Sequence, residues 1–305
     1  MKNDNFLPNL FIPGAGKSGT SSLHNYLNVH PDIYMSERKE PFYFNSLSLY
    51  AEEIEWYQNL FKEGKEQKYR GESSTAYFVS PLAIDRMKND LDDPRFIIIL
   101  RNPISRLVSH YFWLKGKGLE YRSLIQAVKY YQKMPFNEYY HIRKHGKFYL
   151  QFSLYSKWVE NYLKAFGRDK VFIITTEALK SRPVETLNDC FNFLNLDKIK
   201  DINTDQEFNV STFRNVPKWD AWFIHYLYTS DSKNSIFRYR DKIVPEFFKE
   251  LYWKFHTKLT MNRVSKNKPV ISEEIKLWLK NLLADDVKRL KEITKMEFDE
   301  WEEFC

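Results

Sequence analysis

The chain has 305 residues, of which 43% are hydrophobic and 17% aromatic, so it can bury a large core and is not disordered by composition. Lys and Arg outnumber Asp and Glu by 47 to 40, and the resulting net charge of +7 is a mild bias toward anionic ligands. The longest apolar run, at residues 96–100, is too short to cross a bilayer.

The two cysteines and the N-terminal residues indicate in which cellular compartment the protein is expected. Cys190 lies in an apolar helical stretch and Cys305 is the last residue, so no disulfide is expected between them. The opening sequence MKNDN lacks the apolar stretch of a signal peptide. We therefore expect a cytoplasmic protein with no membrane partner.

The first half of the chain alternates short apolar runs with helical patterns, which is typical of βα units around a parallel sheet. The first predicted strand, at residues 10–12, is followed by a glycine loop and by a helix at about residues 19–30. Further strands are predicted at residues 69–72, 95–100 and 171–174, and further helices at residues 54–61, 82–89, from 103 onward and around 187–194. The predicted fold class is α/β, a P-loop-like parallel sheet flanked by helices.

The last third of the chain has a different pattern. Beyond about residue 217 it is helical and aromatic-rich, and it ends in a charged helix that begins near residue 272. We predict one domain over residues 1–305, made of a nucleotide-binding α/β core at 1–216 and a helical C-terminal cap at 217–305.

The sequence GAGKSGT at residues 14–20 lies between a predicted strand and a predicted helix. Its glycines allow a tight turn with exposed N–H groups, the helix directs the positive end of its dipole at the loop, and Lys17 adds a full charge. Hydroxyl groups follow at Ser18, Thr20, Ser21 and Ser22. The pattern predicts a phosphate-binding loop, and the alternative is an ordinary glycine-rich turn.

A nucleoside-triphosphatase loop does not fit this segment. That motif needs a glycine five residues before Gly16, where the chain has Phe11. A magnesium-dependent enzyme of that class also needs an acid at the end of a buried strand, but residues 96–100 end in Arg101. We therefore predict phosphate binding without a metal, and a nucleotide kinase remains the less favoured alternative.

Several segments resemble one family. Residues 17–23, KSGTSSL, resemble the 5′-phosphosulfate loop of the sulfotransferases that use 3′-phosphoadenylyl sulfate (PAPS), and residues 101–111, RNPISRLVSHY, resemble their 3′-phosphate motif. The segments KEPFYF at 39–44, GESSTAY at 71–77 and NVS at 209–211, with Arg214 following, are similar to the bacterial members and to the related heparan sulfate branch. These blocks occur in family order.

The resemblance implies roles for individual residues. Lys17 would stabilise the leaving phosphate, and Glu40 would be the general base toward the acceptor; its alternative is a surface pair with Lys39. Histidine is a rival base, as in the cytosolic branch of the family, and the available histidines are His24, His110, His141 and His145. The implied donor-binding residues are Lys17, Ser18, Gly19, Thr20, Ser21, Ser22, Arg101, Ser109 and Arg214.

The acceptor is less constrained. The heparan sulfate branch often has Lys where this chain has Ser73, and it uses a disulfide-bearing C-terminal loop that this chain lacks. We expect a hydroxyl, or an amine, of a small molecule or natural product, with a glycan as the alternative. Aromatic groups at 42–44, 111–113 and 219–222 would line its pocket or belong to the core. A polyanion-binding protein without catalysis is a further alternative; no nucleic-acid partner is expected, and the oligomeric state is not determined.

Overall fold

The computed structural model describes residues 6–117, 119–134, 136, 146–204, 213–214, 251, 264–265 and 270–305. The chain forms two compact units, each assembled from separate segments. The first unit, here called the sheet unit, comprises Met1–Arg106, Phe152–Asn209 and Lys280–Cys305. The second unit comprises Leu107–Gln151 and Val210–Leu279. The predicted single domain with a boundary at residue 216 stays a prediction.

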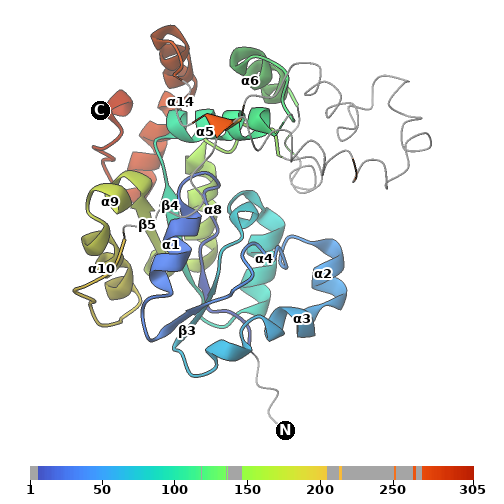
Figure 1. Ribbon diagram of the computed structural model, residues 1–305, viewed down its shortest axis with the longest axis vertical. Helices are drawn as coiled ribbons and strands as arrows, with labels where there is room; N and C mark the ends of the chain where they lie inside the picture. Colours follow the sequence, from blue (N-terminus) through green and yellow to red (C-terminus); the bar gives the residue numbers. More distant parts are fainter. Residues whose placement is uncertain are drawn as a thin grey trace. The chain divides into compact units, whose positions relative to one another are not determined.

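The sheet unit is built on five parallel strands in the order β2-β3-β1-β4-β5 (Figure 1). The strands are β1 (Leu10–Phe11), β2 (Ile33–Met35), β3 (Tyr69–Glu72), β4 (Arg95–Leu100) and β5 (Val171–Thr175). The predicted α/β class with a parallel sheet is confirmed. Because β1 is central and pairs with both β3 and β4, the strand order reverses there, and ligands of such sheets bind beside the carboxyl ends of the strands at this point.

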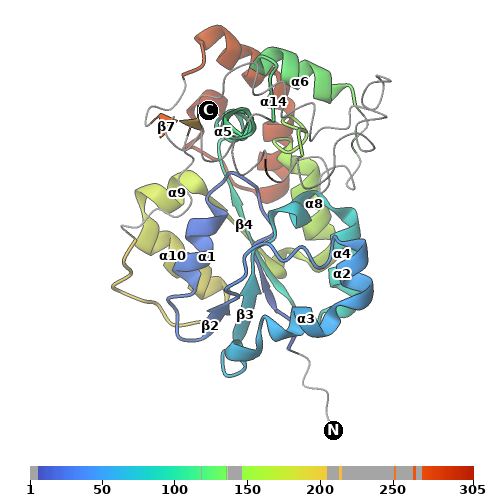
Figure 2. The same ribbon diagram turned by 45° about the vertical axis from the view of Figure 1, so that its right-hand side comes forward.

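Helices cover both faces of the sheet (Figure 2). Successive side chains of a strand point to opposite faces, so a parallel sheet of apolar strands must be covered on both. Leu10, Ile97 and Ile99 belong to one buried cluster with residues of α1 (Thr20–Leu27), α9 (Thr176–Ser181) and α10 (Pro183–Phe193). On the opposite face, Phe96 packs against α8 (Tyr155–Phe166), with ring centroids 4.3 Å from Phe166. α4 (Pro81–Asp90) lies beside α8 on this face.

Most predicted elements are present. α4 begins as expected, because the Ser80 side chain accepts the N–H of Ala83 at 3.1 Å and Pro81 occupies the first turn. The charged C-terminal helix is α14 (Glu273–Thr294). The elements not predicted include α2 (Leu47–Glu52), α6 (Leu124–Gln132), α8, α9 and β2. The short strands β6 (Phe213–Arg214) and β7 (Val264–Ser265) were not predicted either, and β7 lies in the part of the chain that was expected to be helical. Two further helices are α3 (Ile54–Asn59) and α5 (Pro103–Gly116).

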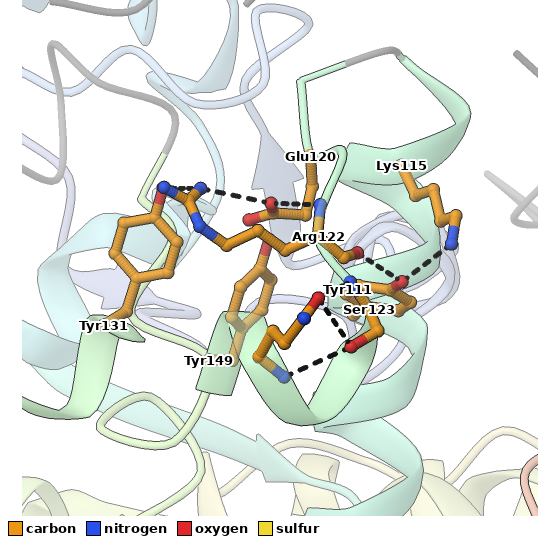
Figure 3. A network of polar contacts seen from close by, with 8 residues as sticks. Tyr111, Lys115, Glu120, Arg122, Ser123, Tyr131 and Tyr149 are labelled. Carbon is orange, nitrogen blue, oxygen red and sulfur yellow. Dashed lines mark hydrogen bonds and ion pairs between the residues drawn. The ribbon is translucent and has the colours of Figure 1, made fainter. Parts of the chain in front are cut away.

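The second unit contains a buried polar network around Glu120, on the connection between α5 and α6 (Figure 3). The fully buried carboxylate of Glu120 accepts hydrogen bonds from the Tyr149 hydroxyl at 3.1 Å and from the backbone N–H of Arg122 at 3.0 Å. The Arg122 guanidinium lies 3.4 Å from Glu120 and 4.0 Å from the ring centroid of Tyr130. Ser123 and Gln126 form a capping box at the start of α6, so this connection is tightly fixed.

None of the helices formed by the described residues is both long and apolar enough to span a membrane.

Candidate functional site

Three neighbouring strands of the sheet unit end at one edge, and the segment after each of them carries residues that the sequence predicted for the site. β1 is followed by the glycine loop, β3 by residues 73–75, and β4 by Arg101. These strands are adjacent in the parallel sheet, so the three segments start side by side. The candidate site is therefore at the carboxyl edge of β3, β1 and β4, where the strand order reverses.

The glycine loop is bonded to β4. The N–H of Ala15 donates to the carbonyl of Ile99 at 2.7 Å, and the N–H of Ile99 donates to the carbonyl of Gly14 at 2.9 Å. On the other side of the loop, the hydroxyl of Thr176 donates to the carbonyl of Ser18 at 2.6 Å. These bonds hold the loop in one place before any ligand binds.

The glycine loop ends where α1 begins. Gly19 is the N-cap of α1, with a φ of 88°, a backbone conformation that glycine adopts easily. No side chain at this N-cap accepts a hydrogen bond, so the first-turn N–H groups of α1 are not capped by it. Together with the positive end of the helix dipole and Lys17, they form the kind of site that binds phosphate. Thr20 and Ser21 are buried in this turn, whereas Ser22 is half-buried.

Arg101 reaches the glycine loop from the end of β4. Its Nη1 donates a hydrogen bond to the carbonyl oxygen of Lys17 at 3.3 Å. The Tyr155 hydroxyl donates to the carbonyl of Arg101 at 2.9 Å, which fixes the backbone at this point. The structure thus brings the Arg101 guanidinium to the backbone of Lys17, the two residues that the sequence predicted for opposite ends of one nucleotide.

C-terminal residues support the end of β4. The N–H of Asn102 donates to Glu177 at 3.1 Å, and the indole N–H of Trp301 donates to the other oxygen of the same carboxylate at 3.2 Å. The side-chain amide of Asn102 also donates to Glu303 at 2.6 Å. The last residues of the chain therefore contact the residue next to Arg101, although the sequence did not predict this.

The structure does not describe Ser109 or the Arg214 side chain in contact with the glycine loop. Ser109 is buried on α5, in the part of the helix that belongs to the second unit. The backbone of Arg214 lies in β6 and pairs with Val264 of β7, while its side chain is outside the described part of the structure. Their contacts with a 3′-phosphate stay predictions.

Glu40 lies beside the glycine loop. The hydroxyl of Thr75 donates to the Glu40 carboxylate at 2.8 Å, and the N–H of Glu40 donates to the carbonyl of Ser73 at 3.1 Å. Thr75 also approaches the loop, since a Cβ atom on Gly16 would lie 3.7 Å from its side chain. Glu40 is half-buried and anchored to the segment after β3, which differs from a solvated surface pair with Lys39.

Lys17 and Glu40 also share an unusual backbone conformation. Their φ angles are 74° and 57°, in the left-handed region that residues other than glycine rarely occupy. Such conformations store strain and cluster at functional sites, where the surrounding structure holds them. The two proposed catalytic residues are thus held in place by their neighbours.

Lys39 is a residue of this site that the sequence analysis missed. Its Nζ donates to the hydroxyl of Ser21 at 2.5 Å and to that of Thr20 at 3.3 Å, both in the first turn of α1. Burial lowers the pKa of Lys39, and the charge of Glu40 opposes this shift. The only signal in the sequence was its position next to Glu40, which also fits a surface pair.

A buried carboxylate supports the segment that carries Glu40. Glu72, at the end of β3, is fully buried and accepts hydrogen bonds from the hydroxyls of Tyr57 at 2.5 Å, Ser74 at 2.6 Å and Tyr77 at 2.9 Å. Ser74 in turn accepts the N–H of Phe42 at 3.1 Å. This cluster therefore fixes the backbone two residues beyond Glu40.

The titration of Glu72 has a consequence for stability. Burial raises the pKa of Glu72 to about 7 from 4.5, although its three hydrogen bonds lower it, and the charge of Glu40 raises it further. Between pH 4.5 and about 7, Glu72 therefore keeps its proton in the folded state but loses it in the unfolded state. The contribution of protonated Glu72 to the free energy of unfolding is complete below pH 4.5 and is lost as the pH rises through about 7. The difference is on the order of 3 kcal/mol.

We expect Glu72→Gln, which is neutral at every pH, to remove this dependence. The free energy of unfolding, measured by urea denaturation between pH 4.5 and 8, should fall less with rising pH in this variant than in the unsubstituted chain. The exposed Glu66→Gln serves as the control, since its side chain is 81% exposed. Identical pH dependence in the Glu72 variant and the unsubstituted chain would contradict a raised pKa.

The histidine alternatives fit the role of base poorly. His24 is buried, its Nδ1 lies 2.6 Å from the Ser73 hydroxyl, and burial together with the charge of Lys39 lowers its pKa to about 4. A base with so low a pKa has little affinity for a proton near neutrality. His110 is buried in the second unit, and His141 and His145 are outside the described residues.

Two of the aromatic residues near Glu40 belong to the core. Tyr43 and Phe44 are buried, and Tyr43 stacks on Tyr57 with ring centroids 4.1 Å apart. Phe42 is half-buried and remains a candidate for the acceptor pocket. Residues 219–222 are outside the described residues.

Among the described residues, no group of three His, Cys, Asp or Glu side chains could hold a metal ion. The expectation that the reaction needs no metal stays a prediction.

Comparisons with known proteins identify the family of this chain. A family model described as "Sulfotransferase domain" matches residues 7–220. The membrane-associated sulfotransferase kil1 of Dictyostelium discoideum is 39% identical over 116 residues, which cover 36% of this chain and 24% of that protein. Heparan sulfate glucosamine 3-O-sulfotransferase 3A1 of Mus musculus is 28% identical over 216 residues, which cover 69% of this chain and 51% of that protein. The chain thus spans a quarter to a half of these relatives.

A solved structure has the same fold. The crystal structure of a sulfotransferase from Alicyclobacillus acidocaldarius matches with a TM-score of 0.64 and 24% sequence identity, over 97% of this chain and 98% of that one. The similarity extends beyond the segment that the family model matches.

Proposed function

Because the chain belongs to the sulfotransferase family, we propose that it transfers a sulfuryl group from PAPS to a hydroxyl, or an amine, of a small-molecule or natural-product acceptor. The observation that carries the proposal is the 3.3 Å hydrogen bond from the Arg101 guanidinium to the carbonyl of Lys17. This contact joins the Arg101 guanidinium to the backbone of the glycine loop that carries Lys17, and it supports a ligand with phosphates at both its 5′ and 3′ positions.

The residues at the site fit such a donor chemically. The N–H groups of the first turn of α1, its hydroxyls and the Lys17 ammonium suit the 5′-phosphosulfate, since all are hydrogen-bond donors to an anion. The planar guanidinium of Arg101 can donate two parallel hydrogen bonds, which suits the 3′-phosphate. Ser109 and Arg214 complete the proposed donor-binding set.

Lys17 and Glu40 carry the proposed chemistry. Glu40 accepts the proton that the acceptor hydroxyl loses as its oxygen forms a bond to sulfur. Lys17 stabilises the negative charge that builds on the bridging phosphate oxygen as its bond to sulfur breaks. The products are the sulfated acceptor and 3′,5′-ADP, and Glu40 returns its proton to water.

The acceptor class is the least constrained part of the proposal. A glycan is the alternative, and it is supported by the match to heparan sulfate glucosamine 3-O-sulfotransferase 3A1. Ser73 argues for a different acceptor, because the heparan sulfate branch often has a lysine there. Phe42, half-buried and two residues beyond the proposed base, would offer an apolar surface to a small acceptor.

Nucleotide binding tests the proposal directly. We expect the chain to bind 3′,5′-ADP and to ignore ATP when no metal is present, as measured by isothermal titration calorimetry. Arg101→Ala should weaken binding of 3′,5′-ADP about 10- to 100-fold, since it removes a charge-assisted contact, while changing the affinity for 5′-AMP much less. An equal loss for both nucleotides would contradict the assignment of Arg101 to the 3′-phosphate.

Transfer of labelled sulfate from PAPS to a panel of phenols, alcohols, sugars, amines and guanidinium alkaloids identifies the acceptor. Labelling of sugars alone would favour the glycan alternative. Magnesium-dependent ATP binding would favour a nucleotide kinase. Salt-sensitive binding of polyanions without transfer would favour a binding protein.

A further inference from the structure

We propose that Lys39 is a second cationic residue of the donor site, and that its ammonium group binds the 5′-phosphosulfate together with Lys17. This inference rests on the proposed function, because it assumes that donor. It adds a residue that the sequence analysis considered only as one member of a surface pair with Glu40.

The contacts of Lys39 place its charge at the phosphate-binding turn. Its Nζ is 2.5 Å from the Ser21 hydroxyl and 3.3 Å from the Thr20 hydroxyl. Both hydroxyls belong to the first turn of α1, at the positive end of the helix dipole. A phosphate held by this turn would lie within reach of the ammonium group.

Lys39 reaches this turn from another part of the chain. The segment that follows β2 is held against β3, because the N–H of Ser36 donates to the carbonyl of Gly71 at 2.9 Å and the N–H of Glu40 donates to that of Ser73 at 3.1 Å. These backbone bonds on both sides of Lys39 hold its backbone beside β3. Its side chain then reaches the Ser21 and Thr20 hydroxyls.

The charge of Lys39 is only partly compensated by its neighbours. Its hydrogen bonds go to two neutral hydroxyls, and the adjacent Glu40 carboxylate accepts a hydrogen bond from Thr75. Burial lowers the pKa of Lys39, and the charge of Glu40 opposes this shift. An anionic ligand beside the ammonium group would add a favourable interaction.

Lys39 would also strengthen the neighbouring hydroxyls as donors. A hydroxyl oxygen that accepts a hydrogen bond from a cation becomes polarised, and its own proton then binds an anion more strongly. Ser21 and Thr20, which the sequence assigned to the donor, are the two hydroxyls in question. Lys39 would thus act through its own charge and through them.

Replacing Lys39 with methionine tests the inference, since methionine keeps an unbranched chain without the charge. We expect Lys39→Met to weaken binding of 3′,5′-ADP about 10- to 100-fold in calorimetric titrations and to lower kcat/KM for PAPS at least as much. Lys39→Arg, which keeps the charge, should retain most of the affinity. The control is Lys164→Met on α8, whose side chain is 70% exposed and which should bind as the unsubstituted chain does.

An NMR titration of His24 reports on the placement of Lys39 independently of nucleotide binding. The charge of Lys39 contributes to lowering the pKa of His24 to about 4, so this pKa should rise in Lys39→Met while burial still keeps it below 6.5. An unchanged pKa in a folded variant would contradict the placement of the ammonium group.

The outcomes separate this inference from the proposed function. If the unsubstituted chain binds 3′,5′-ADP and Lys39→Met binds it equally well, the inference is wrong and the proposed function stands. If the unsubstituted chain does not bind 3′,5′-ADP, the proposed function is wrong and the inference fails with it. A loss of affinity in Lys39→Met but not in Lys164→Met supports both.

Discussion

Replacing Lys17 with alanine should lower kcat for sulfuryl transfer about 10²- to 10³-fold, the usual effect of removing one group that stabilises charge in a transition state. The ammonium group of Lys17 is the cation of the glycine loop, where the leaving phosphate is proposed to bind. The measurement is the steady-state rate of 3′,5′-ADP release from PAPS with a saturating acceptor.

Two variants control for indirect effects of the Lys17 substitution. Lys62→Ala removes an exposed lysine from the same unit and should leave kcat unchanged. Lys17→Arg keeps the charge and should recover part of the rate. The φ of 74° at this position is unfavourable for lysine and alanine alike, so the substitution adds little new backbone strain. A Lys17→Ala enzyme with full kcat would remove Lys17 from the mechanism.

Replacing Glu40 with glutamine should lower kcat about 10²- to 10⁴-fold, the range found when a general base is lost. Glutamine has the shape of glutamate and can still accept the hydrogen bond that Thr75 donates at 2.8 Å. It cannot take a proton from the acceptor. We therefore expect the affinity for 3′,5′-ADP to stay within about twofold of the unsubstituted chain, because only proton transfer is lost.

The pair of measurements on Glu40→Gln distinguishes a base from a binding residue. A parallel loss of nucleotide affinity would mean that Glu40 supports the donor site, and the assignment as base would be wrong. Glu63→Gln, at an exposed position of the sheet unit, provides the matched control and should change neither quantity.

Local patterns were enough to predict the frame of the site. The strands β3 and β4 have the predicted ends, and the glycine loop lies between β1 and α1 as expected. Buried parallel strands are continuous apolar runs, and a phosphate loop needs glycines at close spacing, so both leave a signal within a few residues. β2, with three residues, is too short for a hydrophobic period to show.

The contacts that complete the site join segments far apart in the chain. Arg101 and Lys17 are 84 residues apart, and Thr75 and Glu40 are 35 residues apart. No local pattern in the sequence predicts that Lys39 contacts Ser21, or that Glu72 is buried and supports the segment that carries Glu40. These positions follow from the order of the strands, because β3 and β4 flank β1 and bring their following segments to its end.

The residue types in the glycine loop and at the end of β4 were sufficient to propose a site for a phosphorylated nucleotide, since charge and hydrogen-bonding capacity are properties of single residues; that this site works without a metal stays a prediction. Which charges meet, which are buried and which pKa values shift became visible only in the folded chain. Distance and loss of hydration depend on packing between elements, and Lys39 and Glu72 owe their properties to that packing alone.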